Sequence, residues 1–257
     1  MSGPPERPTV VILGASNVTR GLGALRALLG RAVPGAPLEV MAALGMGRSY
    51  GLTSHVIGRG LPSVLECGLW RALDERPRPG LVAFVTDVGN DLLYGQDVGT
   101  ILAWVDECTA RLQARGARLV LTSLPPAVAE ISRARFLLFR SILFPRSTLR
   151  FESLETALPA LDDGLRRIAS RYGAAFVELR RDWYGFDPIH VRLRAHREAF
   201  TEIVSAAASV DSCPSVPLSR ALQTFALLAE RQWIFGREIR RPQPCLREAD
   251  GTTVSLY

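Results

Sequence analysis

The sequence predicts an α/β fold in which a parallel sheet is covered by helices on both faces. Five short runs have continuous rather than alternating hydrophobicity, which is typical of strands buried on both sides. Longer segments with helical spacing lie between these runs, and such alternation of strand and helix favours parallel pairing. The predicted strands are Thr9–Leu13, Leu38–Ala43, Leu81–Thr86, Arg118–Thr122 and Ala175–Glu178.

The helical segments carry apolar residues at the spacing of an amphipathic helix. The last of them ends at Tyr172 and is followed by Gly173, a residue type that favours the end of a helix. The predicted helices are Val18–Leu29, Leu61–Leu73, Val98–Ala114 and Leu154–Tyr172.

A chain of 257 residues is long enough for one compact domain with appendages. We expect an α/β domain over residues 1–210 and a C-terminal extension over residues 211–257 that packs on it. Within the extension, Leu218–Trp233 has helical spacing, and Asp250-Gly251 favours a turn before a strand over Thr252–Tyr257.

The segment 125–151 falls outside the regular alternation. It contains two apolar runs, 136–139 and 142–144, with arginines on either side. An apolar stripe of this kind is more often a helix packed on its own core than a membrane contact. We therefore expect this segment to pack on the core or to form a lid.

Composition excludes several classes of protein. Hydrophobic residues make up 47% and charged residues 22% of the chain, which is ordinary globular usage. The formal net charge is +6, but the arginines are scattered over helical faces, so we expect no nucleic-acid partner. No apolar run is long enough for a signal peptide or a membrane span, which makes the cytoplasm the expected location. The four cysteines lack metal-ligand spacing, so we expect neither a metal nor a disulfide framework.

Residues with chemical potential follow the predicted strands, at the sheet edge where α/β proteins bind ligands. Ser16 follows the first strand at the start of a helix, where it is either a nucleophile or an N-cap. A glycine-rich loop, 44–51, follows the second strand. Asn90 follows the third strand and provides an amide donor for an oxyanion, or closes an Asx-turn.

A histidine and an aspartate follow the fifth strand. Asp187 lies three residues before His190, and Pro188 restricts the backbone between them. A general base near neutral pH needs such a histidine. We expect His55 on a helix surface and His196 at the start of a helix, and we assign neither a catalytic role.

These motifs, taken in order, resemble the four sequence blocks of the SGNH/GDSL hydrolase superfamily over residues 9–195. The blocks are Gly14-Ala15-Ser16, Gly47, Gly89-Asn90-Asp91 and Asp187-x-x-His190. The resemblance implies a flavodoxin-like three-layer α/β/α sandwich with a five-stranded parallel sheet. It also implies an esterase that acts on a small-molecule ester without a metal or organic cofactor.

The resemblance further implies a role for each block. Ser16 would attack the acyl carbon, with His190 as the base and Asp187 orienting it. The backbone N–H groups of Ser16 and Gly47 and the Asn90 amide would form the oxyanion hole, and Gly45 is the alternative to Gly47.

The first block departs from the family pattern, because Ala15 stands where Gly-Asp-Ser has an aspartate, and this changes how the nucleophile loop is held. The acyl and leaving groups stay undetermined, although Leu92, Leu93, Tyr94, Trp183 and Phe186 suggest a partly apolar pocket.

Two other functions are alternatives to this one. A nucleotide-binding α/β protein requires a different glycine spacing after the first strand, and the usual motifs require a lysine, which this chain lacks entirely. A non-catalytic binding protein on the same fold is the second alternative, and the joint presence of Ser16, Asn90, Asp187 and His190 argues against it.

Overall fold

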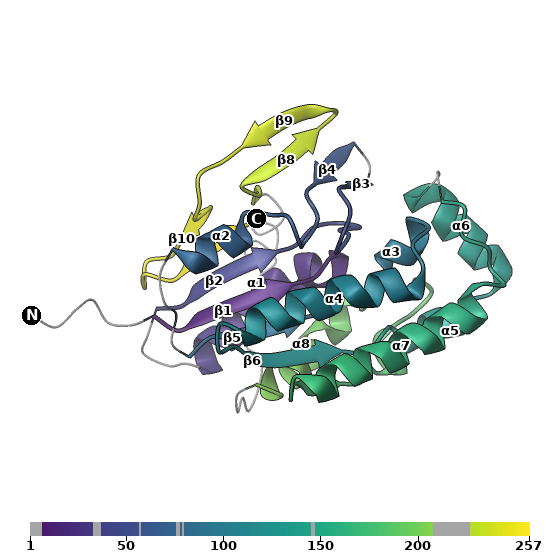
Figure 1. Ribbon diagram of the computed structural model, residues 1–257, viewed down its shortest axis with the longest axis horizontal. Helices are drawn as coiled ribbons and strands as arrows, with labels where there is room; N and C mark the ends of the chain where they lie inside the picture. Colours follow the sequence, from purple (N-terminus) through teal and green to yellow (C-terminus); the bar gives the residue numbers. More distant parts are fainter. Residues whose placement is uncertain are drawn as a thin grey trace, which may run out of the picture.

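A central seven-stranded sheet organises the molecule (Figure 1). The computed structural model describes residues 7–32, 37–56, 58–75, 78, 80–144, 147–207 and 227–257. The strand order is β10-β11-β2-β1-β5-β6-β7, and all neighbouring pairs are parallel except β10 with β11. The strands are β1 (Thr9–Leu13), β2 (Glu39–Ala43), β5 (Val82–Val85), β6 (Arg118–Thr122), β7 (Ala175–Val177), β10 (Leu246–Arg247) and β11 (Thr253–Leu256).

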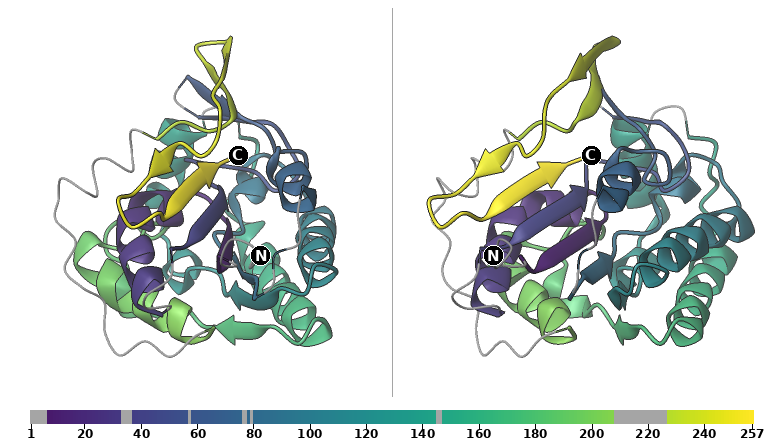
Figure 2. Two further views of the ribbon diagram at one scale, coloured as in Figure 1. Left: turned by 90° about the vertical axis from the view of Figure 1, so that its left-hand side faces the viewer. Right: turned by 60° about the vertical axis from the view of Figure 1, so that its left-hand side comes forward.

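The five predicted strands are all present, but the expected number of strands was wrong. The tail adds β11 in parallel beside β2, with Val254 opposite Val40, and β10 then pairs antiparallel with β11. Figure 2 shows these yellow strands extending the sheet beyond β2. The apolar side chain of Val254 is fully buried, which explains why the tail joins the sheet rather than lying in solvent.

Helices cover both faces of the sheet, as predicted. Alternate residues of β1 enter two different cores: Val11 and Leu13 enter one, and Val10 and Ile12 enter the other. The first core contains α2 (Leu69–Asp74), α4 (Val98–Gln113) and α7 (Leu154–Arg171), and the second contains α1 (Ser16–Ala32) and α8 (His196–Ser205).

A second, antiparallel sheet of four strands, which was not predicted, takes in Leu61 of one predicted helix and residues 231–233 of another. Its order is β3 (Ser54–Val56), β4 (Arg59–Leu61), β8 (Arg231–Ile234) and β9 (Arg237–Arg240). Only the C-terminal part of the predicted helix Leu61–Leu73 is helical, as α2. Pro62 disfavours helical geometry at Leu61, the residue before it. His55 was expected on a helix surface, but it lies exposed in β3.

The predicted helix Leu218–Trp233 is wrong at its C-terminal end, and residues 218–226 lie outside the described part of the chain. Residues 231–233 belong to β8 instead. A two-residue turn, Phe235-Gly236, connects β8 to β9 with φ values of 48° and 82°. Positive φ at both central residues is typical of tight hairpins, so turn chemistry outweighed helical spacing here.

The described residues of the segment 125–151 form a helical arm at one end of the molecule (Figure 1). It contains α5 (Pro126–Ala129) and α6 (Arg133–Leu143), and a short helix, α3 (Asn90–Leu93), lies nearby. One face of α6 buries Phe136, whereas Leu137, Leu138 and Ile142 are exposed.

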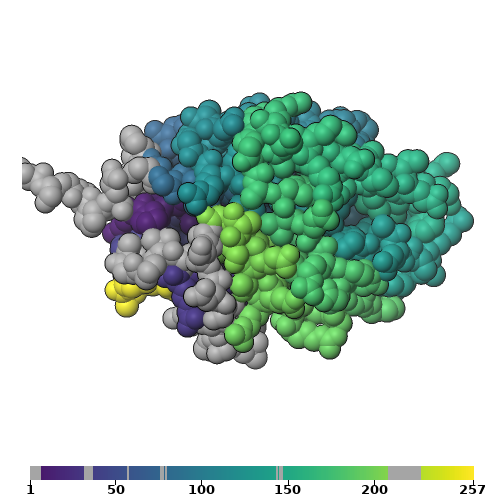
Figure 3. All heavy atoms as spheres, turned by 90° about the horizontal axis from the view of Figure 1, so that it is seen from below, coloured from purple at the N-terminus to yellow at the C-terminus, as the bar shows by residue number. Residues whose placement is uncertain are grey.

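Seen from the edge of the sheet at β7, α7 and α8 form a green surface, and the arm projects at one end (Figure 3). Two short 3₁₀ helices, η1 (Arg181–Trp183) and η2 (Leu193–Ala195), lie between β7 and α8. Within the described residues, no helix has the length and apolarity that crossing a bilayer requires.

Candidate active site

Ser16 begins α1 immediately after β1, and its side chain is nearly buried. The tight passage from strand to helix depends on Gly14, because a Cβ there would lie 2.8 Å from Thr86 Oγ1. The hydroxyl therefore lies at the N-terminus of a 17-residue helix. Helix N-termini carry partial positive charge, which favours an anion forming at this position.

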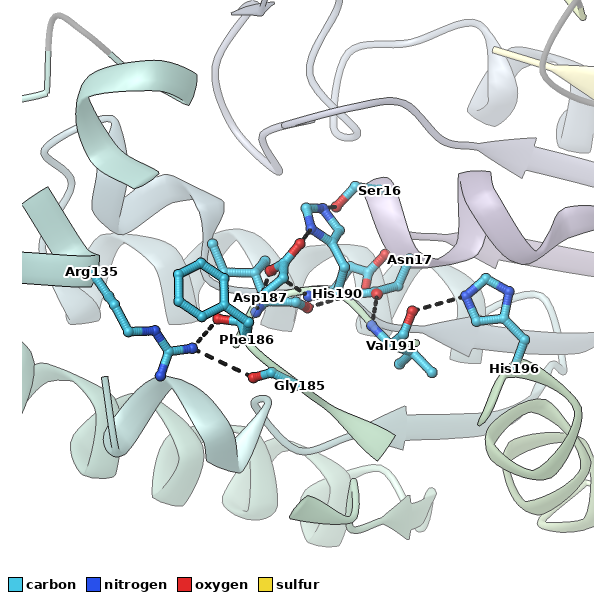
Figure 4. A network of polar contacts seen from close by, with 11 residues as sticks. Ser16, Asn17, Arg135, Gly185, Phe186, Asp187, His190, Val191 and His196 are labelled. Carbon is cyan, nitrogen blue, oxygen red and sulfur yellow. Dashed lines mark hydrogen bonds and ion pairs between the residues drawn. The ribbon is translucent and has the colours of Figure 1, made fainter. Parts of the chain in front are cut away.

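Ser16, His190 and Asp187 form a continuous hydrogen-bonded line (Figure 4). Ser16 Oγ lies 3.0 Å from His190 Nε2, and His190 Nδ1 lies 2.6 Å from Asp187 Oδ2. These distances are those of a nucleophile, a base and an orienting acid. The arrangement brings together residues that are 174 positions apart in the chain.

The Asp187 carboxylate also holds its own loop. Its Oδ1 accepts hydrogen bonds from the backbone N–H of Ile189 at 3.0 Å and of His190 at 3.2 Å. Burial raises the pKa of the Asp187 carboxyl, but the hydrogen bond and charge of the His190 ring, together with the backbone N–H groups of Ile189 and His190, outweigh this effect and leave the pKa below its ordinary value. Asp187 is therefore ionised at neutral pH, as a partner for an imidazolium must be.

A second network of hydrogen bonds, which the sequence did not predict, joins the loop around Ser16 to the residue that follows β5. Asp87 follows β5 and has a positive φ of 55°. Its carboxylate accepts hydrogen bonds from Ala15 N at 3.0 Å, Val18 N at 3.2 Å and Asn17 Nδ2 at 2.9 Å. Ala15, the residue before Ser16, has no carboxylate of its own. The carboxylate that holds this loop comes from Asp87 instead.

Asn17 connects that network to the histidine loop. Its Nδ2 also donates to Ile189 O at 3.0 Å, and its Oδ1 accepts from Val191 N at 2.8 Å. Both main-chain neighbours of His190 are therefore bonded to one amide side chain, which follows Ser16 directly. Figure 4 shows Asn17 beside the His190 loop.

Gly47 and Asn90 lie beside Ser16 and His190. All four residues line one small pocket of about 20 Å³, together with Met46. Gly47 has a φ of +62°, and its carbonyl accepts a hydrogen bond from the Tyr94 hydroxyl at 2.9 Å. Gly45 does not line this pocket; it packs against Leu61, whose Cδ1 would lie 1.9 Å from an added Cβ.

Asn90 and Asp91 join the glycine-rich loop to α3. Asn90 Nδ2 donates to Arg48 O at 3.3 Å, which uses one of its two hydrogens. Asp91 is fully buried and accepts hydrogen bonds from the Ser49 hydroxyl and from Tyr50 N, the latter at 3.1 Å. Burial raises the pKa of the Asp91 carboxyl, and the bond from Ser49 opposes that shift.

Ser16 also lines a second, apolar cavity of about 90 Å³. Its wall includes Leu92 and Leu93, two of the residues expected to form an apolar pocket. The other three lie elsewhere: Trp183 is in a separate core, Tyr94 bonds Gly47, and Phe186 is 70% exposed. The arm completes the wall with Val128, Ile131, Phe136 and Phe139, and α7 adds Leu154 and Leu158.

His196 takes no part in the hydrogen-bonded line of Ser16, His190 and Asp187. His196 begins α8, as predicted, and its Nε2 lies 3.1 Å from Val191 O. Burial lowers the pKa of the His196 imidazole, so its neutral form is favoured. Among the described residues, no group of histidine, cysteine and acidic side chains is arranged to hold a metal ion.

No known family model and no curated protein sequence matches the chain. Solved structures do match. A member of the lipolytic protein G-D-S-L family from Veillonella parvula DSM 2008 superposes with a TM-score of 0.51 at 11% identity, covering 77% of this chain and 97% of that one.

Two further structures give lower scores. TesA gives a TM-score of 0.48 at 16% identity, over 77% of this chain and 97% of its own. A gut microbial diltiazem-metabolizing enzyme, BT4096, gives 0.45 at 15% identity over 80% of this chain. The match covers 48% of that enzyme, so this chain corresponds to about half of its length. At these identities the similarity is one of fold, and this chain shares its fold with the lipolytic G-D-S-L family member from Veillonella parvula.

Proposed function

We propose that the protein is a serine hydrolase that cleaves carboxylic esters through an acyl-enzyme on Ser16. The observation that carries the proposal is the hydrogen-bonded line from Ser16 Oγ through the His190 ring to the Asp187 carboxylate, with lengths of 3.0 and 2.6 Å. A serine hydroxyl is a weak nucleophile until an adjacent base takes its proton. His190 is the group in position to do so.

In the first half of the reaction, His190 Nε2 removes the Ser16 proton as Oγ attacks the carbonyl carbon. The carbonyl oxygen becomes an oxyanion, and the N–H groups of Ser16 and Gly47 and the Asn90 amide are its donors in this proposal. The imidazolium then gives its proton to the leaving-group oxygen, and an alcohol departs. Asp187 stabilises the imidazolium while it exists.

In the second half, water replaces the alcohol. His190 removes a proton from water as the water oxygen attacks the acyl carbon, and the same donors stabilise the second oxyanion. Collapse of this intermediate breaks the bond to Ser16 Oγ and returns a proton to it. The products are a carboxylic acid and the free enzyme, and every proton moves through His190.

Hydrolysis of p-nitrophenyl acetate and butyrate by wild type and by Ser16→Ala tests the proposal. We expect turnover by wild type and its loss by at least a thousandfold in Ser16→Ala. Ser141→Ala is a matched control, because Ser141 is exposed on α6 and lies outside the site. Equal rates for wild type and Ser16→Ala contradict the mechanism, and absence of turnover by a folded wild type supports a binding protein instead.

A further inference from the structure

The space around Ser16 is divided in two, and the two parts differ in which reacting groups they contain. Ser16, Asn90, Phe144 and Ile189 line both spaces. His190 and Gly47 line the small pocket but not the large cavity. An ester bound at Ser16 therefore has two different environments for its two halves.

The chemistry of acyl transfer decides which half enters which space. His190 Nε2 must reach the leaving-group oxygen to protonate it, so the alcohol half lies on the His190 side. The acyl chain extends from the carbonyl carbon in another direction. The large cavity is the space on that side, because Ser16 lines it and His190 does not.

The wall of the large cavity selects for an apolar chain. Most of its side chains are aliphatic or aromatic, contributed by α3, α5, α6 and α7. Its two charged members are already engaged: Asp87 accepts from the nucleophile loop, and Arg140 Nη1 donates to Leu149 O at 2.8 Å. A charged or hydroxylated acyl group would lose its hydration without gaining partners.

The volume of the cavity limits the length of that chain. One water-sized group needs roughly 10–15 Å³ of such space, so the cavity of about 90 Å³ has room for several chain atoms. A methylene group is of similar size to a water molecule. The cavity therefore fits a straight chain of intermediate length.

On the basis of the proposed function, we infer that the substrates are esters of apolar carboxylic acids whose chains are of intermediate length. The acyl chain enters the cavity beneath the helical arm, and the alcohol leaves on the His190 side. The arm, made of α5 and α6, thus sets the chain-length preference.

Two series of esters test the inference. In p-nitrophenyl esters from acetate to palmitate, we expect kcat/KM to rise about threefold to fourfold per methylene up to octanoate, as burial of each methylene predicts, and to fall for palmitate. In alkyl acetates from ethyl to octyl, where only the alcohol lengthens, we expect little change. A flat first series, or a rise in the second alone, overturns the inference while leaving the hydrolase intact; absence of turnover on all esters overturns the proposed function.

Substitutions at Leu158 test the place of the chain. Leu158 lines the cavity and belongs to a satellite core with Ile131, Phe136 and Leu154, which contains none of the reacting groups. Leu158→Trp should move the optimum to shorter chains, and Leu158→Ala should move it to longer ones. Leu138→Trp, on the exposed face of α6, is the matched control. An unchanged chain-length profile in both Leu158 variants overturns the inference.

Discussion

Asn17 and Val191, 174 residues apart, are joined by a 2.8 Å hydrogen bond from the Val191 N–H to the Asn17 side-chain oxygen. The nitrogen of the same amide donates to Asp87 Oδ1 and to Ile189 O, so its hydrogen-bonding groups are satisfied. Asn17 follows Ser16 in the chain, and the residues that it binds flank His190. One side chain thus connects the Ser16 loop to both neighbours of His190.

The first prediction concerns this side chain. Asn17→Ala should lower kcat by about a hundredfold, the order of loss that a 1 Å misplacement of reacting groups causes, with a small effect on KM. Steady-state kinetics on a p-nitrophenyl ester give both constants. Circular dichroism and thermal unfolding check that the variant is folded. A kcat within twofold of wild type in a folded variant contradicts the positioning role.

The second prediction concerns the oxyanion donor. Asn90→Ala should lower kcat by about a hundredfold to a thousandfold, because an amide donor to the developing charge is lost. KM should change little, since the interaction strengthens only in the transition state. A variant that loses less than fivefold in kcat shows that the Asn90 side chain, which donates to Arg48 O, has only a structural role.

The third prediction separates Gly47 from other glycines with positive φ. A Cβ on Gly47 would meet Val56 Cγ2 at 2.4 Å, whereas Gly116, with a φ of +73°, has nothing within 4 Å. Gly47→Ala should shift the loop and lower activity at least tenfold. Gly116→Ala should cost about 1–2 kcal/mol of stability and keep full activity. Equal activities in the two variants argue against Gly47 as a donor.

The fourth prediction follows from the lowered pKa of His196, which burial causes. The folded state binds its proton more weakly than the unfolded state does. The stabilising effect of a neutral His196 is therefore complete above the ordinary pKa of 6.5 and is lost as pH falls below it toward the folded pKa.

Urea unfolding at pH 8, 6.5 and 5 measures this effect. Wild type should lose stability between pH 6.5 and 5, and His196→Gln should lose less over the same interval. The pH 8 value gives the cost of the substitution itself. Parallel pH profiles for the two proteins contradict the assignment.

The sequence is sufficient to predict the central part of the fold, because it depends on local patterns. Each of the five parallel strands is a continuous apolar run, and both faces of β1 are buried. The antiparallel sheet was not predicted. Its strands are three or four residues long, and β8 is fixed by pairing with β4, which is distant in sequence.

The site divides in the same way. Ser16, Gly47, Asn90, Asp187 and His190 could be singled out because each follows a predicted strand or lies within a short motif. The roles of Asn17 and Asp87 could not, because their hydrogen bonds join residues between 69 and 174 positions apart. One local signal did point to Asp87. Ala15 stands where the Gly-Asp-Ser motif has an aspartate, so a carboxylate for this loop has to come from elsewhere in the chain.

The most direct test of the central claim is to find where a fluorophosphonate probe attaches. Intact and peptide mass spectrometry of labelled wild type should give one adduct, on the peptide that contains Ser16, and His190→Ala should remain unlabelled over the same time. A folded wild type that stays unmodified, or an adduct on another residue, contradicts the claim that Ser16 is the nucleophile.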